Sequence, residues 1–131
     1  MQRLAILYVA TLAVMAPLDF LFLGVLARDF FKSQVGGVLG ELNIAAAIAF
    51  YLVYPAGIVI FASNAANGNW QYAAVMGALF GFFCYATFDL TSLALLRGWT
   101  WPAAAVDVGW GMFVTAVSAV SGLLIANAVA R

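Results

Sequence analysis

The sequence predicts an all-α fold, a bundle of four transmembrane helices with both termini on the same side of the membrane. Hydrophobic residues make up 67% of the 131 residues and charged residues only 8%, and the mean hydropathy is +1.10. Soluble domains are about 25% charged, so this chain belongs in a membrane. One crossing needs about 20 mostly apolar residues, which leaves room for about four spans. We therefore expect residues 1–131 to form a single transmembrane domain without a separate extramembrane domain.

The first predicted span covers about residues 4–27. It lies between Arg3 and the charged segment RDFFK, and we expect Pro17 to bend it. Its start resembles a signal peptide, but apolar residues continue to Leu26, well beyond an h-region of about 7–15 residues. We therefore interpret it as a membrane helix.

The second predicted span covers about residues 42–62 and follows a glycine-rich loop, SQVGGVLGE. Glu41 and Asn43 open this span, and Pro55 lies inside it. The segment SNAANGN, rich in Asn and Gly, then predicts an uncharged turn.

The third and fourth predicted spans cover about residues 70–96 and 102–129. The third ends before Arg97, a basic residue followed by a helix-ending glycine. The fourth begins near a proline, which is favourable in the first turn of a helix. Between them, Trp99 and Trp101 are expected to anchor the chain at the membrane interface.

Composition and motifs argue against several functional classes. The chain has no histidine, which removes zinc, haem and di-iron sites built on that residue. Cys84 is the only cysteine and cannot form an internal disulfide. Five Lys and Arg balance five Asp and Glu, so nucleic acid is not an expected partner. There is no GxSxG motif or phosphate loop, so we predict no catalytic residue, cofactor or metal and favour a non-enzymatic role.

Three aspartates are predicted to lie at one depth. At about 1.5 Å per residue, Asp19 lies roughly 13 Å before Arg28 and Asp89 roughly 12 Å before Arg97. Asp107 lies roughly 8 Å beyond the start of the fourth span, which begins on the same side. An ionisable group in hydrocarbon costs at least about 2.5–3.5 kcal/mol and turns towards partners or water. We therefore expect one polar layer inside the bundle.

The candidate site residues of this layer share helix faces or depth with the aspartates. Tyr85 and Ser92 lie four and three positions from Asp89, and Trp110 and Gly111 lie three and four positions from Asp107. The glycine leaves room for a neighbouring helix. The full set is Asp19, Asp89, Asp107, Tyr51, Tyr85, Ser92 and Trp110.

Two interpretations of this layer stay open. The carboxyl groups are either structural, each accepting hydrogen bonds from a neighbouring helix, or they form a functional site. In both cases two interfacial arginines cannot readily neutralise three buried acids, so we expect at least one aspartate to be protonated at neutral pH.

Charge and glycine spacing give two further expectations. Arg28, Lys32 and Arg97 outnumber Arg3 and Arg131, so the positive-inside rule favours a cytoplasmic location for the loops that carry the first three. We call that face the basic side, and we expect the membrane to be the bacterial cytoplasmic (inner) membrane. The segment GALFG resembles a helix dimerisation motif, but in a four-helix chain we favour packing within the bundle.

Four segments together resemble a known family: PLDFLFLG, FYLVYPAGIVIF, GALFGFFCYATFDLTSLALLRGWTWP and VDVGWG. The chain is similar to the bacterial integral membrane proteins catalogued as domain of unknown function 2177. Phe22 and Ser92 depart from the tryptophan and asparagine that we expect there. The resemblance implies a four-helix architecture and no particular activity. Its motif positions correspond to Asp19, Gly24, Tyr51, Tyr54, Tyr85, Asp89, Leu90, Thr91, Gly98, Trp99, Asp107, Trp110 and Gly111.

Three functions compete. In the first, the carboxylate-lined site binds or translocates a small ligand, a cation or a proton, and two copies of the chain form a homodimer to build a pathway. In the second, the protein is an accessory or assembly subunit of a larger membrane complex. The third, ranked last, is a lipid-modifying enzyme that uses carboxylates for acid–base chemistry at the headgroup level. In each of them the lipid bilayer is a partner.

Overall fold

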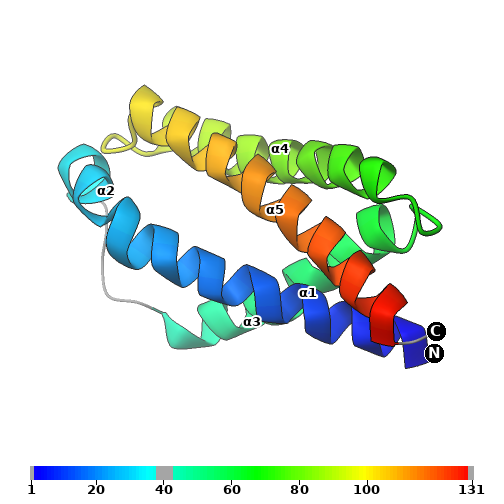
Figure 1. Cartoon of the computed structure of the whole chain (residues 1–131). Coiled ribbons are helices and arrows are strands. Elements are labelled where there is room, and N and C mark those ends of the chain that lie inside the picture. Colours follow the sequence, from blue (N-terminus) through cyan, green and yellow to red (C-terminus); the bar gives the residue numbers. More distant parts are fainter. Residues whose placement is uncertain (1, 38–42, 130–131) are drawn as a thin grey trace.

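The fold was analysed in a computed structural model, which describes residues 2–37 and 43–129. Within these residues all regular structure is helical, and four helical stretches are long and apolar enough to cross a membrane. The start of α1 and the end of α5 lie at the same end of the bundle (Figure 1). The predicted fold class is therefore confirmed. The four stretches are Gln2–Leu26, Ile44–Ser63, Trp70–Leu95 and Trp101–Val129.

The first two spans share one construction, an α-helix that ends in a π-helical turn. The first consists of α1 (Gln2–Leu21) and η1 (Phe22–Leu26), and the second of α3 (Ile44–Ile58) and η2 (Val59–Ser63). The α-helical segment of the first span continues through Pro17 to Leu21. The Asn43 side chain caps α3 by accepting a hydrogen bond from Ala46 N (3.1 Å). Residue 42 and Glu41, expected at the start of the second span, lie outside the described residues.

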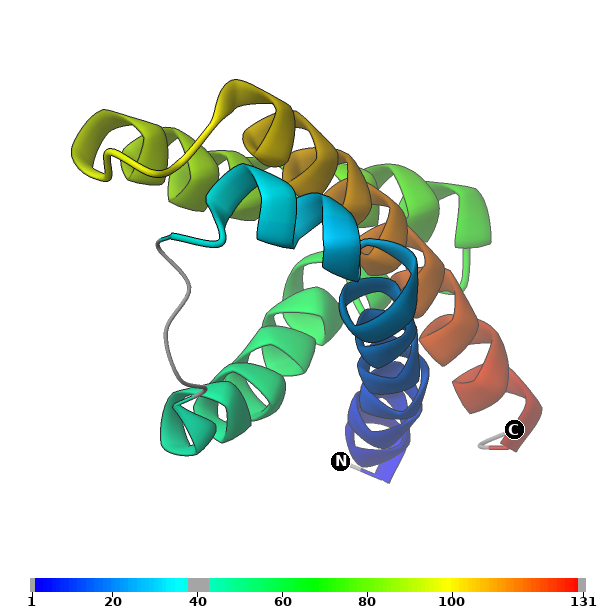
Figure 2. The same cartoon turned by 90° about the vertical axis from the view of Figure 1, so that its left-hand side faces the viewer.

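A short helix, α2 (Arg28–Val35), occupies the start of the segment predicted as a glycine-rich loop. That prediction was wrong for residues 33–35. The helix is amphipathic: Val35 is buried, whereas Asp29 and Lys32 are exposed. Asp29 in its first turn and Lys32 in its last turn both interact favourably with the helix dipole. In Figure 2, α2 crosses the end of the bundle and approaches α5, which it contacts.

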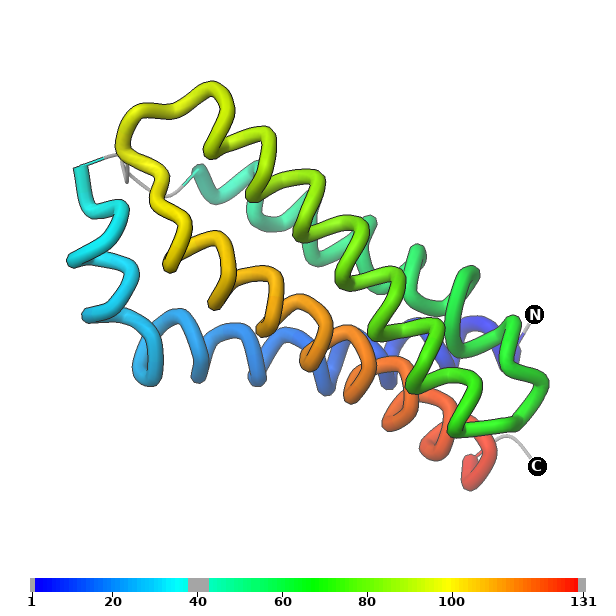
Figure 3. Tube along the Cα trace, turned by 90° about the horizontal axis from the view of Figure 1, so that it is seen from above, coloured from blue at the N-terminus to red at the C-terminus, as the bar shows by residue number. Residues whose placement is uncertain are grey.

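The last two helices, α4 (Trp70–Leu95) and α5 (Trp101–Val129), pack along each other, and α5 also contacts α1 and η2. Figures 1 and 3 show α5 running beside α4, with α1 on its other side. Glycine permits the close approach. A Cβ added at Gly77 would lie 3.0 Å from Ala116 Cα, and one at Gly81 would collide with the Gly111 carbonyl. The GALFG glycines thus pack within the bundle, as predicted.

Two glycines on α5 give a matched test of this packing. An alanine Cβ at Gly111 would collide with the Tyr85 ring, whereas at Gly109 it would meet nothing within 4 Å. We expect Gly111→Ala to lower the stability by about 1–3 kcal/mol through overpacking. Gly109→Ala should leave it unchanged or raise it by up to about 1 kcal/mol, because alanine favours helix. Thermal unfolding in detergent checks both variants, and equal melting temperatures would contradict the close contact.

Candidate functional site

The three aspartates lie in the half of the bundle that adjoins the basic side. Asp19 is in the last turn of α1, Asp89 is near the end of α4, and Asp107 is near the start of α5. The Asp19 side chain is 3% exposed and that of Asp89 is 0% exposed, while Asp107 is half-buried. These positions are inside membrane-spanning helices, where a carboxyl group needs partners.

Asp19 joins three helices. Its Oδ1 accepts a hydrogen bond from Trp110 Nε1 of α5 (2.7 Å), and its Oδ2 accepts one from the Tyr51 hydroxyl of α3 (3.1 Å). The Trp110 indole stacks on Phe22, with ring centroids 4.1 Å apart. Both carboxylate oxygens therefore have a donor, and the donor on α5 is itself held in place by an aromatic contact.

The Asp89 carboxyl group receives fewer hydrogen bonds than that of Asp19. Its Oδ1 accepts a hydrogen bond from Trp99 Nε1 (3.1 Å), but its Oδ2 is buried without a hydrogen-bond partner in the described residues. The Asp107 carboxyl group is a direct neighbour. No Lys or Arg among the described residues interacts with either group, because Arg28 and Arg97 are exposed at the surface. The pair lacks a protein cation.

Tyr85 lies between the two parts of the layer. Its ring packs over Gly111, and the Asp19 and Asp107 carboxyl groups are both close enough to its hydroxyl to interact with it electrostatically. The Tyr54 ring is 6.0 Å away in an edge-on arrangement, and the Tyr54 hydroxyl is hydrogen-bonded to Thr115 (2.8 Å). Aromatic side chains therefore pack in the same part of the bundle as Asp19 and the Asp89–Asp107 pair.

The structure adds detail at two predicted positions. Ser92 is buried on α4, and its hydroxyl makes no hydrogen bond to Asp89 in the described part of the chain. Trp99, predicted as an interface anchor, is half-buried and donates a hydrogen bond to Asp89. Hydropathy could not predict this contact, because Trp99 lies beyond the end of α4 and reaches Asp89 only when the chain folds back between α4 and α5. Trp99 is, however, one of the motif positions of the family resemblance.

Thr100, in the connection between α4 and α5, makes two hydrogen bonds on the basic side. The Thr100 hydroxyl accepts a hydrogen bond from Ala103 N (3.2 Å), which caps α5. The same hydroxyl donates to Gln34 Oε1 of α2 (2.7 Å). The connection that carries Trp99 is therefore tied both to α5 and to α2.

The arrangement limits the chemistry of the site. Among residues 2–37 and 43–129, no three His, Cys, Asp or Glu side chains come together as a metal site would require. Asp19 has its own donors, and only Asp89 and Asp107 are paired. Such a pair can hold a proton or a small cation between its oxygens, and the described residues bring no third His, Cys, Asp or Glu side chain to it.

Membrane-length helices around buried carboxyl groups define a polytopic helical membrane protein. Residues 4–124 match the model of the family described as "Predicted membrane protein (DUF2177)", and the chain belongs to this family. The resemblance inferred from the sequence is thereby confirmed. Comparison with curated proteins and with solved structures gave no match.

The hydrogen bond to Asp89 can be tested with two tryptophans of the same connection. Trp99→Phe keeps an aromatic ring but removes the indole N–H that donates to Asp89 Oδ1, so we expect a loss of about 1–3 kcal/mol of stability. Trp101, which is 72% exposed, is the control, and Trp101→Phe should change the stability by less than about 0.5 kcal/mol. Thermal unfolding in detergent measures both. A Trp99→Phe protein as stable as the control would show that the contact does not support the fold.

Proposed function

We propose that the aspartate layer is an intramembrane site that binds a proton or a small cation, with the Asp89–Asp107 pair at its centre. The protein that carries it belongs to the bacterial cytoplasmic membrane, with the basic side facing the cytoplasm. The observation that carries the proposal is the direct contact between two carboxyl groups: the buried Asp89 Oδ2 receives no hydrogen bond from an N–H group or a hydroxyl among the described residues, and the Asp107 carboxyl group adjoins Asp89.

Electrostatics supports this choice. Two ionised carboxylates in contact repel each other strongly where the effective dielectric constant is low. A proton shared between them, or a monovalent cation, removes the repulsion and supplies the missing partner of Oδ2. Asp19 differs, because Trp110 and Tyr51 already provide donors for both of its oxygens. Asp19 therefore positions the helices around the pair.

Translocation would need a path from the pair to both sides of the membrane. Beyond the layer the bundle is filled mostly by buried apolar side chains such as Met15 and Leu123, and the buried hydroxyls there, including those of Thr11 and Ser118, are isolated from the aspartates. A single bundle therefore supplies only the site and the approach from the basic side. We expect a carrier of this size to form a homodimer, in which the second copy completes the path.

Infrared spectroscopy tests the binding of a proton. Between acid and alkaline pH, the wild-type protein should show the C=O stretch of a protonated carboxylic acid that Asp89→Asn removes. Asn resembles the protonated acid in shape and charge, so this variant should fold. Asp29→Asn, which changes an exposed acid of α2, should leave the band in place. Loss of the band when sodium is added would identify a competing cation, and its absence from the wild type under all conditions would contradict the proposal.

The second candidate, an accessory subunit, has one observation in its favour. An apolar groove of about 300 Å³ lies on the outer surface between η2 and α4 and could hold a helix of another protein. Its lining residues are Phe61, Met76, Leu79, Phe80 and Phe83. Gentle solubilisation followed by native mass spectrometry separates the candidates: a different protein bound at constant stoichiometry supports the subunit, and a homodimer supports the carrier.

A further inference from the structure

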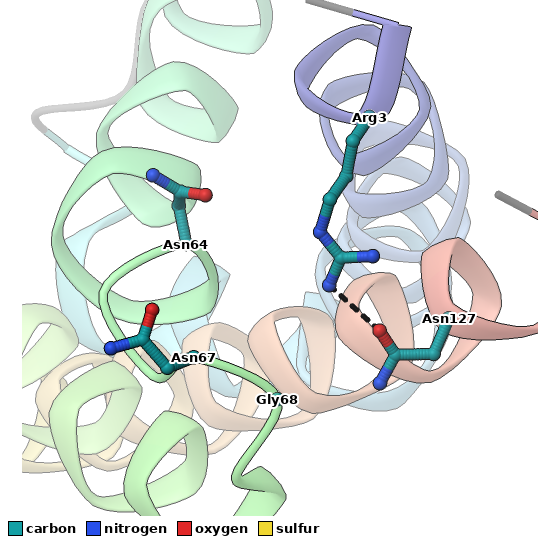
Figure 4. Close-up of a pocket in the computed structure, with 5 residues that line it drawn as sticks. All are labelled: Arg3, Asn64, Asn67, Gly68 and Asn127. Atoms are coloured by element: carbon teal, nitrogen blue, oxygen red, sulfur yellow. Dashed lines mark hydrogen bonds between the residues drawn. The ribbon is translucent and has the colours of Figure 1, made fainter. Parts of the chain in front are cut away.

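A second polar feature lies at the end of the bundle opposite the aspartate layer. Side chains from α1, α5 and the turn after η2 line a surface pocket of about 360 Å³ (Figure 4). We call it the terminal pocket. It is distinct from the proposed proton or cation site in both position and charge. Its lining residues are Arg3, Asn64, Asn67, Gly68 and Asn127.

Arg3 gives the terminal pocket a positive charge. Its side chain extends from α1 along one side of the pocket, and Nη2 donates a hydrogen bond to Asn127 Oδ1 of α5 (2.7 Å) (Figure 4). Arg3 is the only charged side chain that residues 2–37 and 43–129 place at this end of the bundle. The contact with Asn127 uses one of the five N–H donors of the guanidinium and fixes its orientation.

Two amides complete the donor set from the other side of the pocket. The side chains of Asn64 and Asn67 make no hydrogen bond within the described residues, whereas Asn69 of the same turn caps α4 by accepting from Tyr72 N (3.1 Å). Asn67 has a positive φ of 52°, a conformation that Asn tolerates better than most residues. The turn thus places two unused amides opposite a cation.

We infer that the terminal pocket binds a phosphate group. A guanidinium binds phosphate through paired N–H donors, and neutral amides add further donors without repelling an anion. Arg3 lies at the beginning of a membrane span, so the pocket is at the level of the lipid headgroups. The phosphate can therefore come from an anionic phospholipid or from solution, and both sources have the same chemistry.

Binding measurements on the full-length protein in detergent test the inference and separate the two sources. Phosphatidylglycerol and diacylglycerol with identical acyl chains are compared by native mass spectrometry, and inorganic phosphate is added in a parallel thermal-shift assay. Preference for phosphatidylglycerol without an effect of inorganic phosphate indicates a lipid headgroup, whereas stabilisation by inorganic phosphate indicates a soluble anion. No preference for phosphatidylglycerol and no effect of phosphate would overturn the inference.

Matched variants locate the site. Arg3→Gln should weaken the binding at least about tenfold, as expected for the loss of a charge-assisted contact. Arg97→Gln removes an exposed cation from the basic side and should change the binding less than about twofold. Asn67→Gly removes one amide at a position whose backbone suits glycine, so it should weaken binding even if Arg3→Gln folds poorly. Equal losses in Arg3→Gln and Arg97→Gln would show general attraction of lipid to surface arginines and would overturn the inference.

Discussion

The buried carboxyl groups and their indole and phenol donors hold the helices of this protein in one arrangement. Helices in a bilayer gain little hydrophobic free energy from association, because lipid tails are as apolar as their side chains. Close packing and hydrogen bonds between helices must supply the specificity instead. Asp19 receives hydrogen bonds from α3 and α5, and Asp89 receives one from the connection that precedes α5. The same groups that are costly to bury therefore determine which helices are neighbours.

The aspartate pair depends in turn on close backbone packing. Asp89 and Asp107 lie on adjacent helices, and their carboxyl groups meet because α4 and α5 approach closely at glycines. At Gly111 the absence of a side chain leaves the space that the Tyr85 ring fills. A larger residue there would move the ring that lies between Asp19 and the pair. Packing and polar chemistry are thus parts of one arrangement on the basic side.

Most of the fold was predictable because the membrane imposes it. Apolar length gives the number of spans, and a rise of about 1.5 Å per residue gives the depth of Asp19, Asp89 and Asp107 without any knowledge of packing. The contacts were not predictable in this way. Spacing along α4 suggested Ser92 as a neighbour of Asp89, whereas the actual donor, Trp99, lies beyond the end of that helix.

Two further features could not be predicted from the sequence. One is a helix too short to give a pattern, and the other is a contact between residues that are far apart in the sequence. The eight residues of α2 contain too few turns for a clear amphipathic period, and glycines follow them. The terminal pocket joins Arg3 to Asn127, which are separated by 124 positions. No local pattern in the sequence relates these two residues. Three-dimensional packing alone brings them together.

The position of the aspartate layer determines how a bound ion could reach it. On the basic side, Asp89 is roughly 12 Å from Arg97 along the helix axis, and the Trp99 connection and α2 lie at this end of the bundle. Towards the other side, the remaining length of α4 back to Trp70 is roughly 28 Å, and the bundle along it contains mostly apolar side chains together with the buried hydroxyls of Thr11, Ser63 and Ser118. A path through this longer, closely packed half would require the helices to separate. Under the proposed function, the basic side is therefore the nearer side for exchange of a bound ion.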